Sequence, residues 1–247
     1  MDELFYQIYG SVPRQGPGSR FSTEKAIRAI PDLPADPMIL DVGCGAGAQT
    51  LVLAGQLGGT IIAVDNHKPY LRVLERNAEI QGFEEVIVPT YADMFDLDFP
   101  DKHFDLVWAE GSIYIMGFGE GLKTLKKFLK NDGYLAVSEV AWLKDSVPAE
   151  LREFWEREYP EMTDVEANLV YAERAGFDLV DYFVLPPTTW WDDFYTPLEK
   201  QLKKFRKQYS EDEDALELIE LSQFEIDLYR KYPDYYSYVF YILKKRS

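Results

Sequence analysis

The sequence has few of the residues from which proteins build disulfides and structural metal sites. It contains one cysteine, Cys44, and two histidines, His67 and His103, among 247 residues. A single cysteine excludes an intramolecular disulfide, and two histidines far apart in sequence make a structural zinc site improbable. We therefore expect no metal. Cys44 lies between two glycines and is interpreted as a space-filling residue, and His103 as part of a loop.

Positive charge and long apolar runs are also scarce. Lys and Arg number 26 against 43 Asp and Glu, a net charge of −17. Such a field repels phosphate backbones and anionic lipids, so no nucleic-acid or membrane partner is expected. No apolar run approaches the roughly 18 residues of a membrane span, and Met1-Asp2-Glu3 lacks the basic start of a signal peptide. We predict a soluble, cytoplasmic protein.

What the sequence does contain is a regular alternation of strand and helix patterns. Apolar strands are predicted at 38–42, 60–64, 86–88, 104–109, 134–140, 177–185 and 235–244. Helical patterns separate the first five strands, which favours a doubly wound, mostly parallel α/β sheet with helices on both faces. We expect one domain over 1–247.

Three segments fall outside this alternation. Residues 1–34 show two short helical patterns and are interpreted as an N-terminal lid. Residues 144–163 and 186–234 are predicted to be helical cap insertions, and the second carries the pair Trp190-Trp191.

The chain is organised around a glycine-rich turn. The strand Ile39–Val42 runs into Gly43, Gly45 and Gly47, and a helical pattern follows at once. Glycines at this spacing let a ligand approach the backbone closely, and the helix start offers unpaired N–H groups. A nucleotide-like ligand is therefore expected. The residues satisfy the dinucleotide pattern G-x-G-x-x-A, with Asp65 about 20 residues after Gly43, and they also satisfy D-x-G-x-G-x-G.

Further motifs favour the second pattern. Ala92-Asp93-Met94 follows the third predicted strand, and Phe104-Asp105-Leu106-Val107 forms the fourth. With LDVGCGAG at 40–47, the chain over 36–143 resembles the class I S-adenosylmethionine-dependent methyltransferases. Over nearly its whole length it is similar to a bacterial and archaeal small-molecule group without an assigned substrate, through RQGPGS (14–19), WAEGSIY (108–114), SEVAW (138–142) and YVFYI (238–242).

This resemblance implies a seven-stranded Rossmann-like sheet whose last strand, 235–244, is antiparallel. It implies S-adenosylmethionine as cofactor and S-adenosylhomocysteine as product. The cofactor contacts that it implies are Gly43, Gly45, Asp41 and the backbone around Glu110 for the methionine part, Asp65 with flanking Asn66 and His67 for the ribose, and Asp93 and Met94 for the adenine. For Asp93 a role in a turn stays open, and His67 could simply precede Pro69.

Candidate groups for the chemistry follow the carboxyl ends of the fourth and fifth strands, where open α/β sheets bind ligands. The catalytic candidates are Glu110, Tyr114 and Glu139. Together with the substrate-binding candidates Tyr114, Trp142, Trp190 and Trp191, the acids are predicted to form a cage for a cationic amine. Alternatively, Glu139 holds the loop, and the aromatic residues are the core of the cap.

Other classes of function are weighed against this prediction. Strand four lacks an Asn/Asp-Pro-Pro-Tyr-type sequence, which argues against a nucleic-acid substrate, and one cysteine argues against a thiol-rich arsenic methyltransferase. An NAD-dependent oxidoreductase and a non-catalytic cofactor-binding regulatory protein remain as alternatives. The aromatic terminal strand could pair at a sheet edge with a second copy and form a homodimer.

Overall fold

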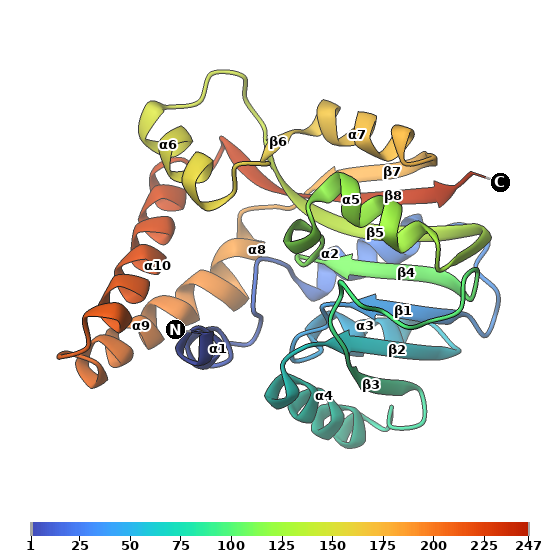
Figure 1. Cartoon of the computed structure of the whole chain (residues 1–247). Coiled ribbons are helices and arrows are strands. Elements are labelled where there is room, and N and C mark those ends of the chain that lie inside the picture. The colour runs from blue at the N-terminus through green and yellow to red at the C-terminus, as the bar shows by residue number, and fades with distance from the viewer. Residues whose placement is uncertain (1, 247) are drawn as a thin grey trace.

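A computed structural model describes residues 2–246 and shows an eight-stranded sheet with helices on both faces (Figure 1). The strand order is β3-β2-β1-β4-β5-β8-β7, and short β6 pairs with β5. The strands are β1 (Met38–Val42), β2 (Thr60–Asp65), β3 (Ile87–Tyr91), β4 (Phe104–Glu110), β5 (Leu129–Trp142), β6 (Thr163–Asp164), β7 (Phe177–Val184) and β8 (Tyr236–Lys245).

All strand pairs are parallel except those of β8, which runs antiparallel to both β5 and β7. This confirms the doubly wound sheet with an antiparallel last strand. The expected pairing of this strand with a second copy at a sheet edge is wrong, because β8 is hydrogen-bonded on both sides. The edges of the strand order are β3 and β7 instead.

The helices are α1 (Asp2–Tyr9), α2 (Arg20–Ala29), α3 (Ala48–Gln56), α4 (Lys68–Gln81), α5 (Phe118–Lys126), α6 (Ala149–Glu158), α7 (Val165–Arg174), α8 (Thr188–Trp190), α9 (Thr196–Gln208) and α10 (Glu213–Lys231). Alternate strand residues serve the two faces of the sheet. Leu40 and Val42 pack in the core formed with α5 and α7, whereas Ile39 belongs to the core formed with α2, α3 and α4.

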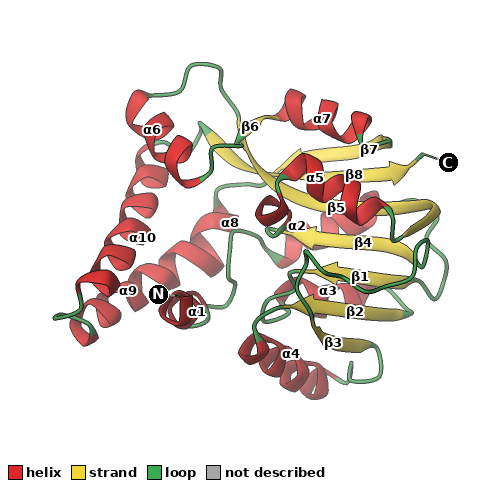
Figure 2. Ribbon diagram, viewed as in Figure 1, coloured by secondary structure: helices red, strands yellow, loops and turns green. Residues whose placement is uncertain are grey.

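Helices from three distant parts of the chain gather at one end of the sheet. In Figures 1 and 2, α1, α6, α9 and α10 lie together beyond β1, β4 and β5. The Tyr9 and Ser222 hydroxyl oxygens, on α1 and α10, are 3.2 Å apart. Trp190 stacks on Tyr229 with ring centroids 4.4 Å apart and donates to the Ser237 hydroxyl at 3.0 Å. The cap is therefore tied to the sheet by buried aromatic side chains.

The connection after β7, predicted to be a helical insertion, is helical almost from its start. Trp191–Tyr195 forms a π-helical turn that joins α8 directly to α9. A 3-10 helix, Ile113–Met116, follows β4. Neither has a strong local signal, because such turns are set by packing on neighbouring elements. Within residues 2–246 no helix combines the length and the apolar character needed to cross a membrane.

Candidate active site

The glycine-rich turn after β1 is closely packed against its surroundings. Gly43, Gly45 and Gly47 adopt φ values of +72°, +55° and +87°, a region that side-chain-bearing residues rarely adopt. A Cβ on Gly43 would lie 2.4 Å from the Ser112 Cβ. The amides of Gly43 and Cys44 both donate to the Val64 carbonyl at 2.9 Å. The turn is thus fixed against β2 and Ser112 and exposes bare backbone on its open side.

Asp65, at the end of β2, ties this turn to the start of α4. Its two carboxylate oxygens accept hydrogen bonds from the amides of Gly45 (2.9 Å) and His67 (2.8 Å). Burial raises the pKa of Asp65, and both amide hydrogen bonds oppose the rise. The carboxylate is half-buried and borders the open space above the glycines.

That open space, here called the loop cavity, has a volume of about 290 Å³. Its walls come from the glycine turn, the ends of β2 and β3, the 3-10 helix and α1. Six of the residues predicted to contact a cofactor line it: Gly43, Gly45, Asp65, Asn66, Asp93 and Met94. Asp93 also accepts from the Phe95 amide at 2.9 Å, so its side chain has the turn role that was left open beside the predicted adenine contact.

Three residues of the predicted cofactor set do not line the loop cavity, namely Asp41, His67 and Glu110. Asp41 is buried beneath the turn, where it accepts hydrogen bonds from Thr50 Oγ1 (2.6 Å) and Gln49 Nε2 (3.3 Å). Burial raises the pKa of Asp41 to about 7. The His67 ring stacks on Tyr6 with centroids 3.9 Å apart. Asp41 therefore braces α3 against β1, and His67 holds α1 at the cavity's edge.

Glu110, predicted as both catalytic and cofactor-binding, has its carboxylate fully engaged. It shares a face of β4 with Trp108, whose Nε1 donates to Glu110 Oε2 at 3.1 Å. Arg14 Nη2 lies 2.6 Å from Oε1, and the Thr23 hydroxyl donates at 3.0 Å. This arrangement does not support a catalytic role. The carboxylate instead fastens the N-terminal segment to the sheet beside a small pocket of about 70 Å³.

Gln15, which sequence reasoning did not assign, bridges the N-terminal segment and the glycine turn. Its Oε1 accepts from the Ala46 amide at 3.0 Å, and its Nε2 donates to the Val12 carbonyl at 3.4 Å. The Gln15 side chain lines the loop cavity and also the second, larger cavity described below. The RQGPGS motif was the signal that could have identified it.

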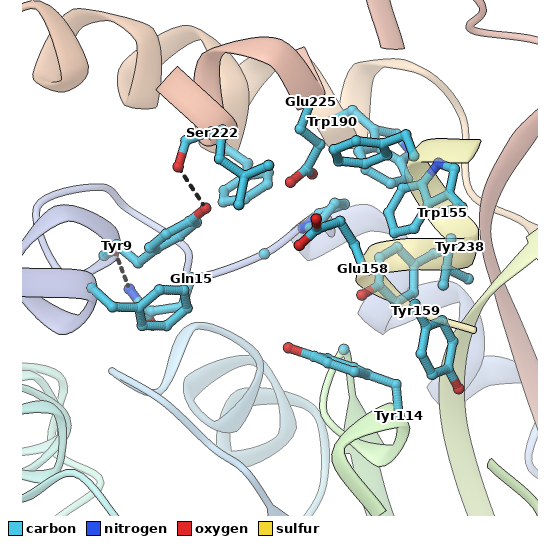
Figure 3. A pocket seen from close by; sticks show the side chains of 18 of the residues that line it. Tyr9, Gln15, Tyr114, Trp155, Glu158, Tyr159, Trp190, Ser222, Glu225 and Tyr238 are labelled. Atoms are coloured by element: carbon cyan, nitrogen blue, oxygen red, sulfur yellow. Dashed lines mark hydrogen bonds between the residues drawn. The ribbon is translucent and has the colours of Figure 1, made fainter. Parts of the chain in front are cut away.

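A second space, here called the cap cavity, has a volume of about 350 Å³ and lies between the sheet end and the cap helices (Figure 3). Both cavities share a set of wall residues, here called the junction: Phe5, Tyr9, Gln15, Gly111 and Tyr114. The two spaces therefore meet at the end of β4, one of the two strand ends where the sequence predicted candidate groups for the chemistry.

The aromatic cage predicted from the sequence is only partly assembled. Tyr114 and Trp190 line the cap cavity, with Trp155, Phe194 and Tyr238. Trp142 and Trp191 are not among the lining residues. Trp142 makes an edge contact with Tyr236, with ring centroids 6.2 Å apart, and Trp191 packs under the Arg230 guanidinium, 5.0 Å from its carbon. Trp142 therefore packs between β5 and β8 of the sheet, and Trp191 packs among the cap helices.

Two carboxylates that sequence reasoning missed point into the cap cavity. Figure 3 shows Glu158, from α6, and Glu225, from α10, facing the same space. Glu225 Oε1 accepts from the Tyr195 hydroxyl at 2.7 Å. Burial raises the pKa of Glu225, and the charge of Glu158 raises it further. Their helices are far apart in the sequence, so no local pattern marked them.

Glu139 faces away from both cavities. It shares a face of β5 with Leu135 and Val137, on the side of α5 and α7. Burial raises the pKa of Glu139 to about 8, although the neighbouring Tyr159 hydroxyl lowers it. Its Oε2 is buried without a hydrogen-bond partner among the described residues. This orientation does not support the catalytic role predicted for Glu139, and the alternative that it holds the loop stays in place.

No group of three or more His, Cys, Asp or Glu side chains in residues 2–246 is arranged to hold a metal ion. The arrangement is that of two adjoining cavities, one over the glycine turn and Asp65 and the other lined by aromatic rings with Glu158 and Glu225. Such a pair can hold two reactants with their reacting atoms at the junction.

The comparisons with known proteins bear on the same region. The family profile described as "Methyltransferase domain" matches residues 35–201. The methyltransferase GfsG of Streptomyces halstedii is 26% identical over 155 residues, which cover 61% of this chain and 56% of that protein. Phosphoethanolamine N-methyltransferase 1 of Zea mays is 28% identical over 192 residues, covering 77% of this chain and 36% of that protein. The match thus spans about half or less of these relatives.

The fold itself is shared with solved structures. A SAM-dependent methyltransferase from Geobacter sulfurreducens, in complex with S-adenosyl-L-homocysteine, superposes with a TM-score of 0.82. The two chains are 16% identical, and the superposition covers 100% of this chain and 99% of the other. At 16% identity, the superposition shows that the two chains share a fold and nothing beyond that.

Proposed function

The chain belongs to the methyltransferase-domain family, and from this we propose that it transfers a methyl group from S-adenosylmethionine to a small-molecule acceptor. The observation that carries the proposal is the meeting of the loop cavity and the cap cavity at the junction. One cavity has the features of a nucleoside site, and the other is large enough for a small organic acceptor.

The residues of the loop cavity fit the cofactor. The Gly43 and Gly45 backbone, free of Cβ atoms, would lie against the methionine part. The half-buried Asp65 carboxylate would accept hydrogen bonds from the ribose hydroxyls, a charge-assisted contact. Asp93 and Met94 line the far end, where adenine would lie. Bound there, the cofactor supplies a methyl group on a sulfonium, whose sulfur leaves as a neutral thioether.

The protein's own contribution is alignment and exclusion of water. An in-line displacement needs the acceptor atom held close to the methyl carbon and opposite the departing sulfur. Gly111 and Tyr114 border both cavities and would set this approach. Phe5, Tyr9 and Gln15 of the N-terminal segment border both as well, which supports the proposal that this segment is a lid.

We further propose that the acceptor molecule is an amine. Support comes from the cap cavity, where Trp155 and Trp190 accompany the carboxylates of Glu158 and Glu225. Aromatic faces and carboxylates both favour a cation where water is excluded. The Zea mays relative is named an N-methyltransferase of phosphoethanolamine, which is itself an amine. The competing interpretation is that these aromatic side chains only form the core of the cap.

Calorimetry tests the cofactor. S-adenosylmethionine and S-adenosylhomocysteine are expected to bind, and NAD is not. The variant Asp65→Asn is expected to weaken binding by at least about tenfold, because a charged hydrogen-bond acceptor is lost. Asp98→Asn, at an exposed position, is the matched control. Binding of NAD alone would contradict the proposal and favour an oxidoreductase.

The acceptor class is tested with labelled S-adenosylmethionine and a panel of amines, phenols and carboxylates. Transfer of label to amines is the expected result. Methylation of anions alone would contradict the amine assignment. Tight binding of S-adenosylhomocysteine without turnover on any acceptor would favour a non-catalytic, regulatory protein.

A further inference from the structure

The two carboxylates of the cap cavity lie apart from the place where methyl transfer would occur. Glu158 and Glu225 line the cap cavity and not the loop cavity, whereas the junction residues border both. The junction contains Phe5, Tyr9, Gln15, Gly111 and Tyr114, none of which carries a charge at neutral pH. The acceptor site therefore has an acidic end and an uncharged end.

The acidic end has an unsatisfied capacity for hydrogen bonding. Within residues 2–246, the hydrogen bond from Tyr195 is the single one to the Glu225 carboxylate, and it reaches only Oε1. The hydroxyl of Tyr238 has no hydrogen-bond partner in this part of the chain, although Tyr238 is only 9% exposed. Figure 3 shows that hydroxyl pointing into the cavity. Polar groups that face a cavity without a hydrogen-bond partner from the protein favour a polar ligand there.

The negative charges of Glu158 and Glu225 are only weakly compensated by positive charges of the protein, so a ligand cation could bind between them. Arg157 pairs with Glu158 at 2.7 Å, but the Arg157 side chain is 65% exposed, so solvent screens that pair. Glu225 has no ion pair within the described residues. A ligand ammonium between the two carboxylates would relieve their mutual repulsion and satisfy the free oxygen of Glu225.

An ammonium held in this way cannot itself accept a methyl group. Two neighbouring carboxylates keep an amine protonated, and a protonated nitrogen has no lone pair to attack the sulfonium carbon. The group that is methylated must then be a different one, located at the junction. The apolar stretch between the two ends, with Phe154, Trp155 and Phe194, would contact the ligand's hydrocarbon body.

The junction also restricts the chemistry of that second group. A hydroxyl acceptor would need a base, and the junction has no carboxylate or histidine. Burial raises the pKa of Tyr9 and Tyr114, so their hydroxyls stay protonated. An uncharged amine needs no base. A nearby ammonium in the same molecule lowers the pKa of a second amine and helps to keep it uncharged.

Resting on the proposed function, we propose that the acceptor is a diamine with an apolar body, anchored as an ammonium between Glu158 and Glu225 and methylated on its other, uncharged nitrogen at the junction. The lone pair of that nitrogen forms the new N–C bond. The S–C bond breaks with its electrons passing to sulfur, and the alkylated ammonium then loses a proton to solvent.

The test compares linear α,ω-diamines of increasing chain length, and a diamine with a benzene ring between its amino groups, with the matched monoamines. Labelled S-adenosylmethionine reports turnover. At least one diamine is expected to show a kcat/KM roughly tenfold or more above its monoamine, because an ion pair to a partly buried carboxylate is gained. Equal rates for diamines and monoamines would overturn the proposal, as would methylation of phenols alone.

The anchor is tested with Glu225→Gln, which keeps shape and removes charge. KM for the diamine is expected to rise about tenfold while kcat changes less, because the lost contact is equal in ground and transition states. Glu220→Gln removes the same charge from an exposed position on α10 and is expected to have no effect. Glu225→Ala with added acetate offers a rescue of the missing carboxylate. An unchanged KM in both Glu225 variants would overturn the anchor.

Binding of S-adenosylmethionine, measured separately by calorimetry, shows whether a negative result contradicts the diamine assignment or the proposed function. If the cofactor binds and no diamine is preferred, the diamine assignment is wrong and the proposed function stands. If the cofactor does not bind, the proposed function itself is wrong.

Discussion

Arg14 and Glu110 form a buried ion pair, with Arg14 Nη2 2.6 Å from Glu110 Oε1, that joins the N-terminal segment to the end of β4. The Arg14 side chain is 9% exposed and that of Glu110 is inaccessible to solvent. Thr23 and Trp108 complete the hydrogen bonds to the carboxylate. The pair therefore holds the N-terminal segment against the end of β4, next to the glycine turn.

Glu110→Gln is expected to lower the free energy of unfolding by about 3 kcal/mol, because it leaves the Arg14 charge buried without a counterion. It is also expected to weaken S-adenosylmethionine binding, since Gln15 and Gly16 follow Arg14 directly. Urea unfolding and calorimetry measure the two effects. Glu24→Gln, which breaks an exposed pair with Arg20, is the control and is expected to cost less than about 1 kcal/mol. Equal losses in both variants would contradict the assignment.

Substitution of Gly43 tests the packing of the turn. Gly43→Ala adds a Cβ 2.4 Å from the Ser112 Cβ at a φ of +72°. Gly82→Ala meets a similar φ of +73° with no atom within 4 Å. Gly82→Ala is expected to cost about 1 kcal/mol through backbone strain alone, and Gly43→Ala distinctly more. Thermal unfolding and cofactor titration measure both, and a Gly43→Ala protein that binds the cofactor normally would contradict the proposed cradle.

The stacking of Tyr6 on His67 predicts a role for α1 in retaining the cofactor. Tyr6→Leu removes a ring contact with a centroid distance of 3.9 Å. The dissociation constant for S-adenosylmethionine is expected to rise several-fold, since such ring pairs contribute about 1 kcal/mol. Phe21→Leu, at a position 64% exposed on α2, is the control. An unchanged dissociation constant in Tyr6→Leu would show that α1 does not retain the ligand.

The raised pKa of Glu139 predicts that the stability of the folded protein depends on pH. Burial raises its pKa from 4.5 to about 8, so between these values the folded protein binds more protons than the unfolded chain. The free energy of unfolding should therefore fall as pH rises through this window, by up to roughly 1.4 kcal/mol per pH unit.

Glu139→Gln is expected to flatten this slope in urea unfolding at a series of pH values. Asp41, whose pKa is about 7, adds a slope of the same sign in both proteins. Glu166→Gln, at an exposed position of α7, is the control and should leave the slope unchanged. A slope in Glu139→Gln as steep as in the parent would contradict the assignment to Glu139.

The sheet and the glycine turn with Asp65 beside it could be predicted because their signals are local. The apolar strands, the glycine turn and Asp65 all lie within short stretches whose geometry the residues themselves impose. The orientation of Glu110 was also predictable, because Leu106, Trp108 and Glu110 alternate onto one face of β4.

The acceptor side could not be predicted in the same way. Glu158 and Glu225 meet only because α6 and α10 pack across the end of the sheet, and no sequence period records that contact. Trp191 was assigned to the cage with its neighbour Trp190, but adjacent residues on a helix point about 100° apart. One faces the cavity and the other packs beneath Arg230.

The π-helical turn at Trp191–Tyr195 amounts to one extra residue wound into an otherwise continuous helix from Thr188 to Gln208. Deleting a single residue there would leave the helix intact but rotate everything downstream by about 100°. Leu198 and Leu202, now buried, would swing towards water, and charged neighbours would replace them in the core. A change of length in this short segment would therefore alter how α9 packs against the rest of the cap.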